Sequence, residues 1–134
     1  EELQGGSESV MLVDDERSIL EFCRTMLESL GYTVHTFNGS REGLDAFHAA
    51  PDSFDLVVTD MTMPEMSGFE LSRMLKEIRP DIPIILITGF SDIINKDEAM
   101  HVGIHSIMTK PIDMGNFSRT LRQAIESKMK VARG

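Results

Sequence analysis

Residues 54–70 read FDLVVTDMTMPEMSGFE, and this stretch decides how the rest of the chain is interpreted. Its first six residues are mostly apolar and include two valines, which predicts a strand buried on both faces. Asp60 follows directly, and a loop containing Pro64 comes next. Ser67 and Glu70 have the spacing of a capping box, so a helix is predicted to begin there. The stretch is therefore one strand–helix unit with an acid at the end of its strand.

The same unit occurs five times along the chain. Apolar runs predict strands at residues 10–13, 32–37, 54–59, 84–88 and 104–108, and a helical pattern follows each of them, the last two at roughly 92–102 and from 113 onward. The first, third and fourth strands are apolar on both faces, as in a parallel sheet covered by helices on both sides. Right-handed crossovers then favour the strand order 2-1-3-4-5, a flavodoxin-like, doubly wound α/β fold with five helices.

Length and composition fit a single domain. Residues 9–130 are predicted to form it, with a linker at 1–8, which is polar and contains a Gly-Gly pair, and a tail at 131–134. The net charge of −9 argues against this domain binding nucleic acid directly. Cys23 is the single cysteine, so no internal disulfide can form, and we expect a cytoplasmic location. No apolar run is long enough to span a bilayer, so no membrane contact is expected from this domain.

Polar residues follow four of the predicted strands. Asp14 and Asp15 come after the first, Asp60 after the third, Thr88 ends the fourth and Lys110 follows the fifth. These strands are neighbours in the predicted order, and ligands bind at the carboxyl ends of such strands. Two carboxylates about 4 Å apart repel each other by roughly 4 kcal/mol at an effective dielectric constant near 20. The acids therefore need raised pKa values or a divalent cation, and hard oxygen ligands with open positions suit Mg²⁺.

Such a group of residues predicts phosphoryl chemistry. A metal-bound carboxylate can attack phosphorus and form an aspartyl phosphate. The transferring group spreads negative charge over its oxygens, and stabilising that charge is most of the catalysis. Lys110 would supply a positive charge and Thr88 a hydroxyl donor. The acids after the first strand could also simply cap the helix that follows, because acids favour helix N-termini.

Four segments, in this order, resemble the receiver domain of two-component response regulators. They are MLVDDE at 11–16, VVTDMTMPEMSG at 57–68, ITG at 87–89 and TKP at 109–111, and each lies at the end of a predicted strand. The resemblance covers roughly Ser9 to Met129. The lead-in GGSESVMLVDDE and the TGFSD after the fourth strand are most similar to receivers at the C-terminus of hybrid sensor histidine kinases.

The resemblance implies a role for each matched residue. Asp60 is the nucleophile that a kinase phosphohistidine phosphorylates. Asp15 and Asp60 bind Mg²⁺ together with the backbone carbonyl of Thr62, and Asp14 acts nearby or through a water molecule. Thr88 turns toward the phosphoryl group as the switch residue, and Lys110 pairs with that group. The resemblance also implies a cis peptide bond before Pro111.

Three positions depart from the family pattern or vary within it. Ile107 occupies the switch position where family members commonly carry an aromatic residue that rotates as the threonine moves. We therefore expect the signal to be propagated by backbone movement of the loop after the fourth strand and of the fourth helix. Phe90, like Thr62, occupies a position that tunes how fast the phosphoryl group hydrolyses. Our hypothesis is that apolar Phe90 hinders the attacking water, so that Phe90→Glu shortens the life of the phosphoryl group.

The expected partner is a histidine kinase, in the same chain or another, or a histidine phosphotransfer protein. The surface that passes the signal to the next protein or domain is expected at roughly residues 91–129. A phosphorylation-dependent dimer is neither predicted nor excluded by the sequence. The domain is expected to be a regulatory phosphoacceptor with self-catalysed phosphorylation and dephosphorylation, not an enzyme. Because the chain begins at Glu1 rather than Met, we expect a piece of a longer protein, which could be membrane-anchored; a stand-alone regulator is the alternative.

Three other functions were weighed against the receiver. An aspartate-nucleophile phosphatase of the haloacid-dehalogenase type needs a second acid two residues after the nucleophile, where this chain has Thr62. A flavodoxin-like nucleotide binder needs a Gly- or Ser/Thr-rich loop after the first strand, where this chain has DDER. An interaction module that works without phosphorylation would not need the full set of site residues.

Overall fold

The computed structural model describes residues 3–89, 92 and 94–133, with side chains up to residue 127. The chain alternates strands and helices. In order, the elements are β1 (Ser9–Asp14), α1 (Arg17–Ser29), β2 (Thr33–Asn38), α2 (Ser40–Ala49), the short 3₁₀ helix η1 (Pro51–Ser53), β3 (Leu56–Asp60), α3 (Gly68–Ile78), β4 (Ile84–Thr88), α4 (Lys96–Val102), β5 (Ser106–Thr109) and α5 (Met114–Arg133).

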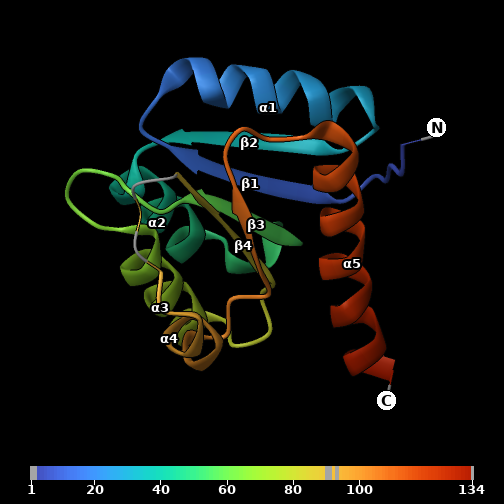
Figure 1. Cartoon of the computed structure of the whole chain (residues 1–134). Helices are drawn as coiled ribbons and strands as arrows, with labels where there is room; N and C mark the ends of the chain where they lie inside the picture. The colour runs from blue at the N-terminus through green and yellow to red at the C-terminus, as the bar shows by residue number, and fades with distance from the viewer. Residues whose placement is uncertain (1–2, 90–91, 93, 134) are drawn as a thin grey trace.

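The five strands form one parallel sheet in the order β2-β1-β3-β4-β5. This confirms the predicted flavodoxin-like topology with five helices. The carboxyl ends of the strands lie together on the left of the molecule in Figure 1, where the loop after β3 projects furthest. The register pairs Val13 with Thr59 and Asp60 with Ile87, so β1, β3 and β4 end within one residue of one another.

Alternation along the strands divides the apolar core in two. One half lies between the sheet and the helices α1 and α5, and the other between the sheet and α2, α3 and α4 (Figure 1). Val10, Leu12 and Val58 face the first half, whereas Met11 and Val57 face the second. Because β1, β3 and β4 are buried on both faces, their side chains hold the strand ends in fixed positions.

The helix α4 and the strand β5 begin later than predicted, for local reasons. The side chain of Asn95 accepts a hydrogen bond from the Glu98 N–H (3.1 Å) and caps α4, so this helix begins at Lys96 and not near residue 92. Gly103 ends it with a left-handed φ of 96°, and the Ile104 N–H donates to the carbonyl of Ala99. Ile104 therefore belongs to the cap of the helix, and β5 begins only at Ser106.

α1 packs on the sheet through one face, on which Cys23, Met26 and Leu27 are buried. Phe22, on the other face, is 60% exposed. Within the part of the chain that the structure describes, none of the helices is both long enough and apolar enough to cross a bilayer. Residues 3–8, predicted as a linker, run along the end of α1 and contact α5 (Figure 1).

Candidate functional site

Three acids meet where β1 and β3 end. Asp14 and Asp60 are the last residues of their strands, and Asp15 follows β1 directly. One carboxylate oxygen from each lies within 4.8 Å of the other two. Asp14 and Asp60 are buried, at 4% and 6% exposure, whereas Asp15 is exposed. The strand-end prediction therefore located this cluster correctly.

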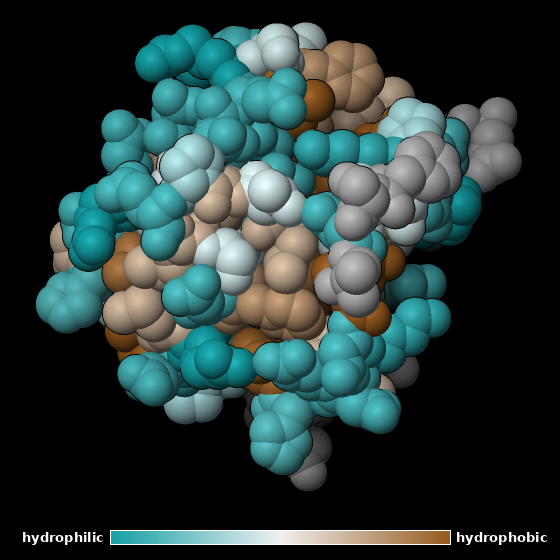
Figure 2. All heavy atoms as spheres, turned by 60° about the vertical axis from the view of Figure 1, so that its left-hand side comes forward, coloured by the Kyte–Doolittle hydropathy of each residue, from teal (hydrophilic) through white to brown (hydrophobic). Residues whose placement is uncertain are grey.

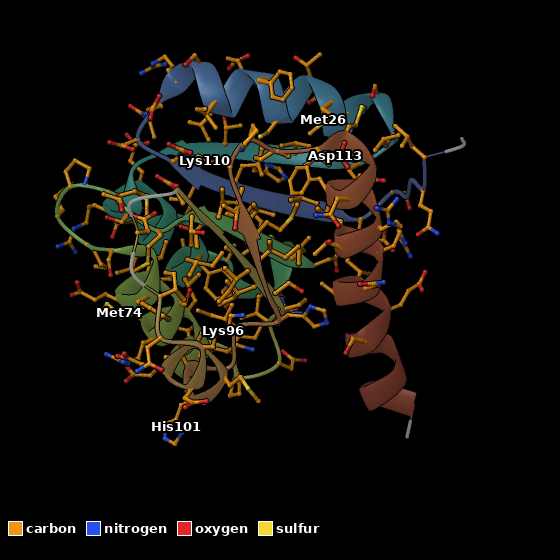
Figure 3. The ribbon with its side chains drawn as sticks, in the orientation of Figure 1. Met26, Met74, Lys96, His101, Lys110 and Asp113 are labelled. Atoms are coloured by element: carbon orange, nitrogen blue, oxygen red, sulfur yellow. The ribbon has the colours of Figure 1, made fainter. Side chains whose placement is uncertain are left out.

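Lys110 completes the cluster with a positive charge. Its side-chain Nζ lies 3.2 Å from Oδ1 of Asp60. Its backbone N–H donates to the carbonyl of Thr88 (2.8 Å), which fixes the backbone of Lys110 beside β4. The peptide bond between Lys110 and Pro111 is cis. Figure 3 shows Lys110 among the strand ends and Asp113 at the start of α5, at the two ends of a short connection.

Burial sets the protonation of the cluster. It raises the pKa of Asp14 to about 6; the hydrogen bond from the Glu16 N–H (2.9 Å) opposes this rise, and the charge of Asp60 adds to it. Burial also raises the pKa of Asp60, against the opposing effect of Lys110. For Lys110, burial disfavours the charged form, but the hydrogen bond to Asp60 and the charges of the neighbouring acids together raise the pKa. Lys110 alone thus leaves the negative charge of the acids only partly neutralised.

This donor set fits a hard divalent cation. Three carboxylates with oxygens this close, one of them facing solvent, match the few protein ligands and several waters that Mg²⁺ prefers. Receiver-like roles for Asp14, Asp15 and Asp60 in metal binding are thus chemically consistent with the geometry. The expected fourth ligand, the backbone carbonyl of Thr62, stays a prediction. The Thr62 hydroxyl has a different partner, since it donates to Oδ1 of Asp92 (2.7 Å).

Thr88 is buried at the end of β4, beside the cluster. Its hydroxyl donates to the carbonyl of Met108 in β5 (3.4 Å), so in this state it contacts β5 and not Asp60. Ile107, at the expected switch position, is half-buried and pairs with Leu86 in the register of the sheet. The switch roles of these two residues stay predictions. Phe90, named for a role in hydrolysis, lies outside the described residues.

Comparison with known proteins identifies the family. The model of the response regulator receiver domain matches residues 10–124. The chain belongs to the response regulator receiver family. A solved receiver domain protein from Clostridium thermocellum is 35% identical, with a TM-score of 0.88 over 92% of this chain and 98% of the other. A CheY-like receiver domain protein from Methanospirillum hungatei is 26% identical, with a TM-score of 0.85 over 93% and 98%.

Curated relatives of this receiver domain are transcriptional regulatory proteins. The C4-dicarboxylate transport transcriptional regulatory protein of Rhizobium meliloti is 33% identical over 120 residues, which are 90% of this chain and 26% of that protein. An uncharacterized transcriptional regulatory protein of Bacillus subtilis is 32% identical over 116 residues, 87% of this chain and 50% of that protein. The receiver domain thus spans about a quarter to a half of the length of these relatives.

The loop after Asp60 packs closely against the end of β3. Gly68 opens α3 so close to the end of β3 that a Cβ there would lie 2.3 Å from the carbonyl oxygen of Asp60. Within the loop, Glu65 has a φ of 70°, and the Met66 N–H donates to the carbonyl of Pro64 (2.8 Å), which makes a tight γ-turn. Ser67 caps α3 by accepting from the Glu70 N–H (3.2 Å), as predicted.

Two polar residues of the receiver site were missed by the sequence analysis. Nδ2 of Asn38, at the end of β2, donates to the carbonyls of Asp14 (3.3 Å) and Asp15 (3.0 Å), and so positions the acidic pair. Asp92 accepts from the Thr62 hydroxyl and from the Gly89 N–H (2.7 Å each), joining the loop after β3 to the backbone after Thr88. Asn38 also follows a strand, so the strand-end rule could have found it.

An apolar groove of about 600 Å³ adjoins Lys110. Ile19, Phe22 and Cys23 of α1 form one wall, Pro111 and Ile112 the other, with Gly89 and Lys110 at the site. Figure 2 brings the strand-end side forward and shows apolar residues in the middle of this face between hydrophilic ones. In this receiver the acidic cluster therefore lies beside apolar surface.

Proposed function

We propose that this receiver domain accepts a phosphoryl group on Asp60 from the phosphohistidine of a histidine kinase or histidine phosphotransfer protein, in a Mg²⁺-dependent reaction. The observation that carries the proposal is the placement of one buried carboxylate, Asp60, against both Lys110 (3.2 Å) and the acids of β1. A carboxylate in that position can act as a nucleophile, and the Lys110 ammonium group beside it can stabilise the negative charge of the phosphoryl group.

The transfer is an in-line displacement. An oxygen of Asp60 forms the new bond to phosphorus while the bond from phosphorus to the histidine nitrogen breaks, and the nitrogen keeps the electron pair. Lys110 stabilises the charge on the phosphoryl oxygens, and the hydroxyl of Thr88 donates to one of them after leaving Met108. Mg²⁺ held by Asp14, Asp15 and Asp60, with the carbonyl of Thr62, would neutralise the negative charge that the acids and the phosphoryl group share.

Phosphorylation then shifts an equilibrium between two conformations. The step of Thr88 from the Met108 carbonyl toward Asp60 is our candidate for the first movement, with Ile107 following in β5. The phosphorylated form is the signal, and dephosphorylation by water resets it. This role makes the domain a regulatory phosphoacceptor whose own residues promote both reactions.

The test is phosphoryl uptake from a small phosphodonor. We expect acetyl phosphate with Mg²⁺ to add one phosphoryl mass to the intact protein, and Asp60→Asn to abolish the gain. Asp52→Asn, which changes an exposed acid of η1, is the matched control and should gain the same mass as the parent. No gain in the parent, or an equal gain in Asp60→Asn, would refute the proposal. Turnover of many equivalents of donor would favour the phosphatase reading instead.

The parent protein has two candidates. The sequence resemblance favours a hybrid sensor histidine kinase, whose kinase core would be the phosphodonor. The curated relatives are transcriptional regulatory proteins, which favours a parent that acts on DNA through another domain. The full-length gene decides between them: a kinase core in the same chain supports the first, and a DNA-binding domain supports the second. In either parent we place this domain in the cytoplasm.

A further inference from the structure

Residues 3–8 follow a defined path along the amino-terminal edge of the sheet. The Gly6 N–H donates to the carbonyl of Leu30 at the end of α1 (3.1 Å). The carbonyl of Glu8 accepts from the Thr33 N–H (3.0 Å), which continues the β1–β2 pairing beyond Ser9. In Figure 1 this segment enters on the right, beside α5 and the end of α1. Its backbone is therefore held from two sides, unlike a free linker.

The glycines of this segment lie close to their neighbours, Gly5 to backbone and Gly6 to side chains. A Cβ on Gly5 would lie 2.2 Å from the carbonyl oxygen of Leu30. A Cβ on Gly6 would lie 2.4 Å from Nη1 of Arg122 and 2.9 Å from the ring of Tyr32. The Gly-Gly pair, which on sequence alone indicates a linker, thus lets the segment pack closely against its neighbours.

Arg122 of α5 fastens the segment to the domain. Its Nη1 lies 2.8 Å from Oε1 of Glu8, across 114 positions of sequence, and its Nε lies 3.3 Å from Oε2 of Glu126. The side chains of Arg122 and Glu8 are only 15% and 24% exposed. Burial disfavours charge on Glu8, but the hydrogen bond from Arg122, backbone hydrogen bonds and the charge of Arg122 together lower the pKa of Glu8. The pair is therefore better shielded than an ordinary surface ion pair.

The helix that holds the segment begins next to the functional site. Asp113 accepts from the Asn116 N–H through Oδ2 (2.9 Å) and from the Phe117 N–H through its carbonyl (2.8 Å), which fixes the first turn of α5. Lys110, the partner of Asp60, stands three residues earlier in the chain (Figure 3). A change in the position of Lys110 is thus applied to the start of the helix that carries Arg122.

We propose that residues 3–8 are a docked strap, with Arg122 as its clasp, through which α5 is coupled to the amino-terminal end of the β1–β2 pairing. Movement of α5 would change the position of the strap and, with it, the hydrogen bond between the Thr33 N–H and the carbonyl of Glu8. The docking of the strap is independent of phosphorylation. Its response to the state of Asp60 rests on the proposed function.

Amide hydrogen exchange tests the docking, with the Thr33 amide as reporter. We expect Gly6→Val, which drives a side chain into Arg122 and Tyr32, and Arg122→Met, which removes the clasp, each to speed exchange at Thr33 by about tenfold or more. Ser7→Val, at an exposed position of the same strap, and Arg24→Met, which breaks only ion pairs within α1, should leave it unchanged. The Val57 amide, bonded in the centre of the sheet, reports whether each variant stays folded.

Equal exchange at Thr33 in the parent, Gly6→Val and Arg122→Met, with Val57 protected in all three, would overturn the strap. Should Gly6→Val fail to fold, Arg122→Met decides alone. In the second arm, acetyl phosphate and Mg²⁺ are added and uptake is followed by mass. We expect exchange at Thr33 to change by about threefold or more in the parent and not in Arg122→Met. Uptake without a change at Thr33 refutes the coupling, whereas absence of uptake refutes the proposed function and leaves the docking result standing.

Discussion

The charged groups at the two ends of the strands are balanced differently. We call the carboxyl ends of the strands the carboxyl edge of the sheet and their amino ends the amino edge. At the carboxyl edge, Asp14, Asp15 and Asp60 crowd together with Lys110 as their close cation. At the amino edge, Arg122 lies between two glutamates, and Gly5 and Gly6 of the strap lie too close to Leu30, Tyr32 and Arg122 to leave room for a Cβ. The first edge holds unbalanced charge where a ligand can relieve it, and the second uses charge to close the structure.

The difference teaches which interactions can serve as a switch. Buried like charges destabilise the folded state until a cation or a chemical change relieves them, so the carboxyl edge responds to its surroundings. A shielded pair that is already satisfied gains little from any further ligand. The amino edge is therefore suited to transmit a change, and the carboxyl edge to generate one.

The largest effect should come from a single methyl group at the carboxyl edge. We expect Gly68→Ala to lower the free energy of unfolding by about 3 kcal/mol, because the new Cβ would overlap the carbonyl oxygen of Asp60 and press on Leu86. Urea unfolding measures the change. Gly115→Ala is the control, since its Cβ would meet nothing closer than 3.5 Å and should be neutral or stabilising. A Gly68→Ala protein as stable as the parent would show that this edge is loosely packed.

The next effect is a fall in stability with rising pH in metal-free buffer. Between the ordinary pKa of 3.8 and about 6, folded Asp14 keeps a proton that the unfolded chain releases. Folding stability from this group is therefore present at low pH and lost as pH rises toward 7, by about 2 kcal/mol. Unfolding curves from pH 4 to 7 for the parent and Asp14→Asn test it, and the free energy of unfolding of the parent, relative to that of Asp14→Asn, should fall by that amount.

Magnesium sharpens the same comparison. Mg²⁺ binds the deprotonated acids, so it should stabilise the parent more at pH 7 than at pH 5, and should add little to Asp14→Asn. A substitution at the amino edge should not change the stabilisation by Mg²⁺. A magnesium effect of the same size in Asp14→Asn as in the parent would remove Asp14 from the metal site.

At the amino edge we expect a smaller loss. Glu8→Gln keeps the shape of the side chain but removes the charge that Arg122 binds, and should lower the free energy of unfolding by about 1–2 kcal/mol. Glu77→Gln changes an exposed acid of α3 and serves as the control. Thermal unfolding at pH 7 compares the three proteins. Identical melting of Glu8→Gln and the control would reduce the clasp to a surface contact.

The smallest effect is predicted for the link between the two loops of the carboxyl edge. Asp92→Ala removes two hydrogen bonds near the surface and should destabilise the fold by about 0.5–1 kcal/mol. Thr62→Val removes the donor of one of them. Because the two changes share that bond, the double variant should lose less than the sum of the single losses in urea unfolding. Strict additivity would mean that the bond between Thr62 and Asp92 contributes nothing.

Much of the carboxyl edge could be predicted from the sequence because its signals are local. The apolar runs place the strands, the strand order follows from handed crossovers, and the acids after β1 and β3 then have to meet. Lys110 was placed by the same rule. The first state of Thr88 was not, since its bond to the Met108 carbonyl depends on a rotamer that no pattern encodes.

The amino edge could not be predicted because its contacts join distant parts of the chain. Glu8 and Arg122 stand 114 positions apart, and neither lies in a motif. The Gly-Gly pair has the composition of a flexible linker, and only the folded neighbours, Leu30 and Tyr32, turn it into a packing requirement. Asp92 was missed for a related reason, since its partners Thr62 and Gly89 belong to different loops.

The strap has a practical consequence for defining the domain. The family match runs from residue 10 to 124, so a protein trimmed to those limits loses both glutamates that hold Arg122. Such a fragment would keep every residue of the acidic cluster and still leave Arg122 of α5 without either of its carboxylate partners. A unit that keeps the strap, Arg122 and both of its glutamates runs from Leu3 through Glu126. Fusions or tags should be attached before Leu3.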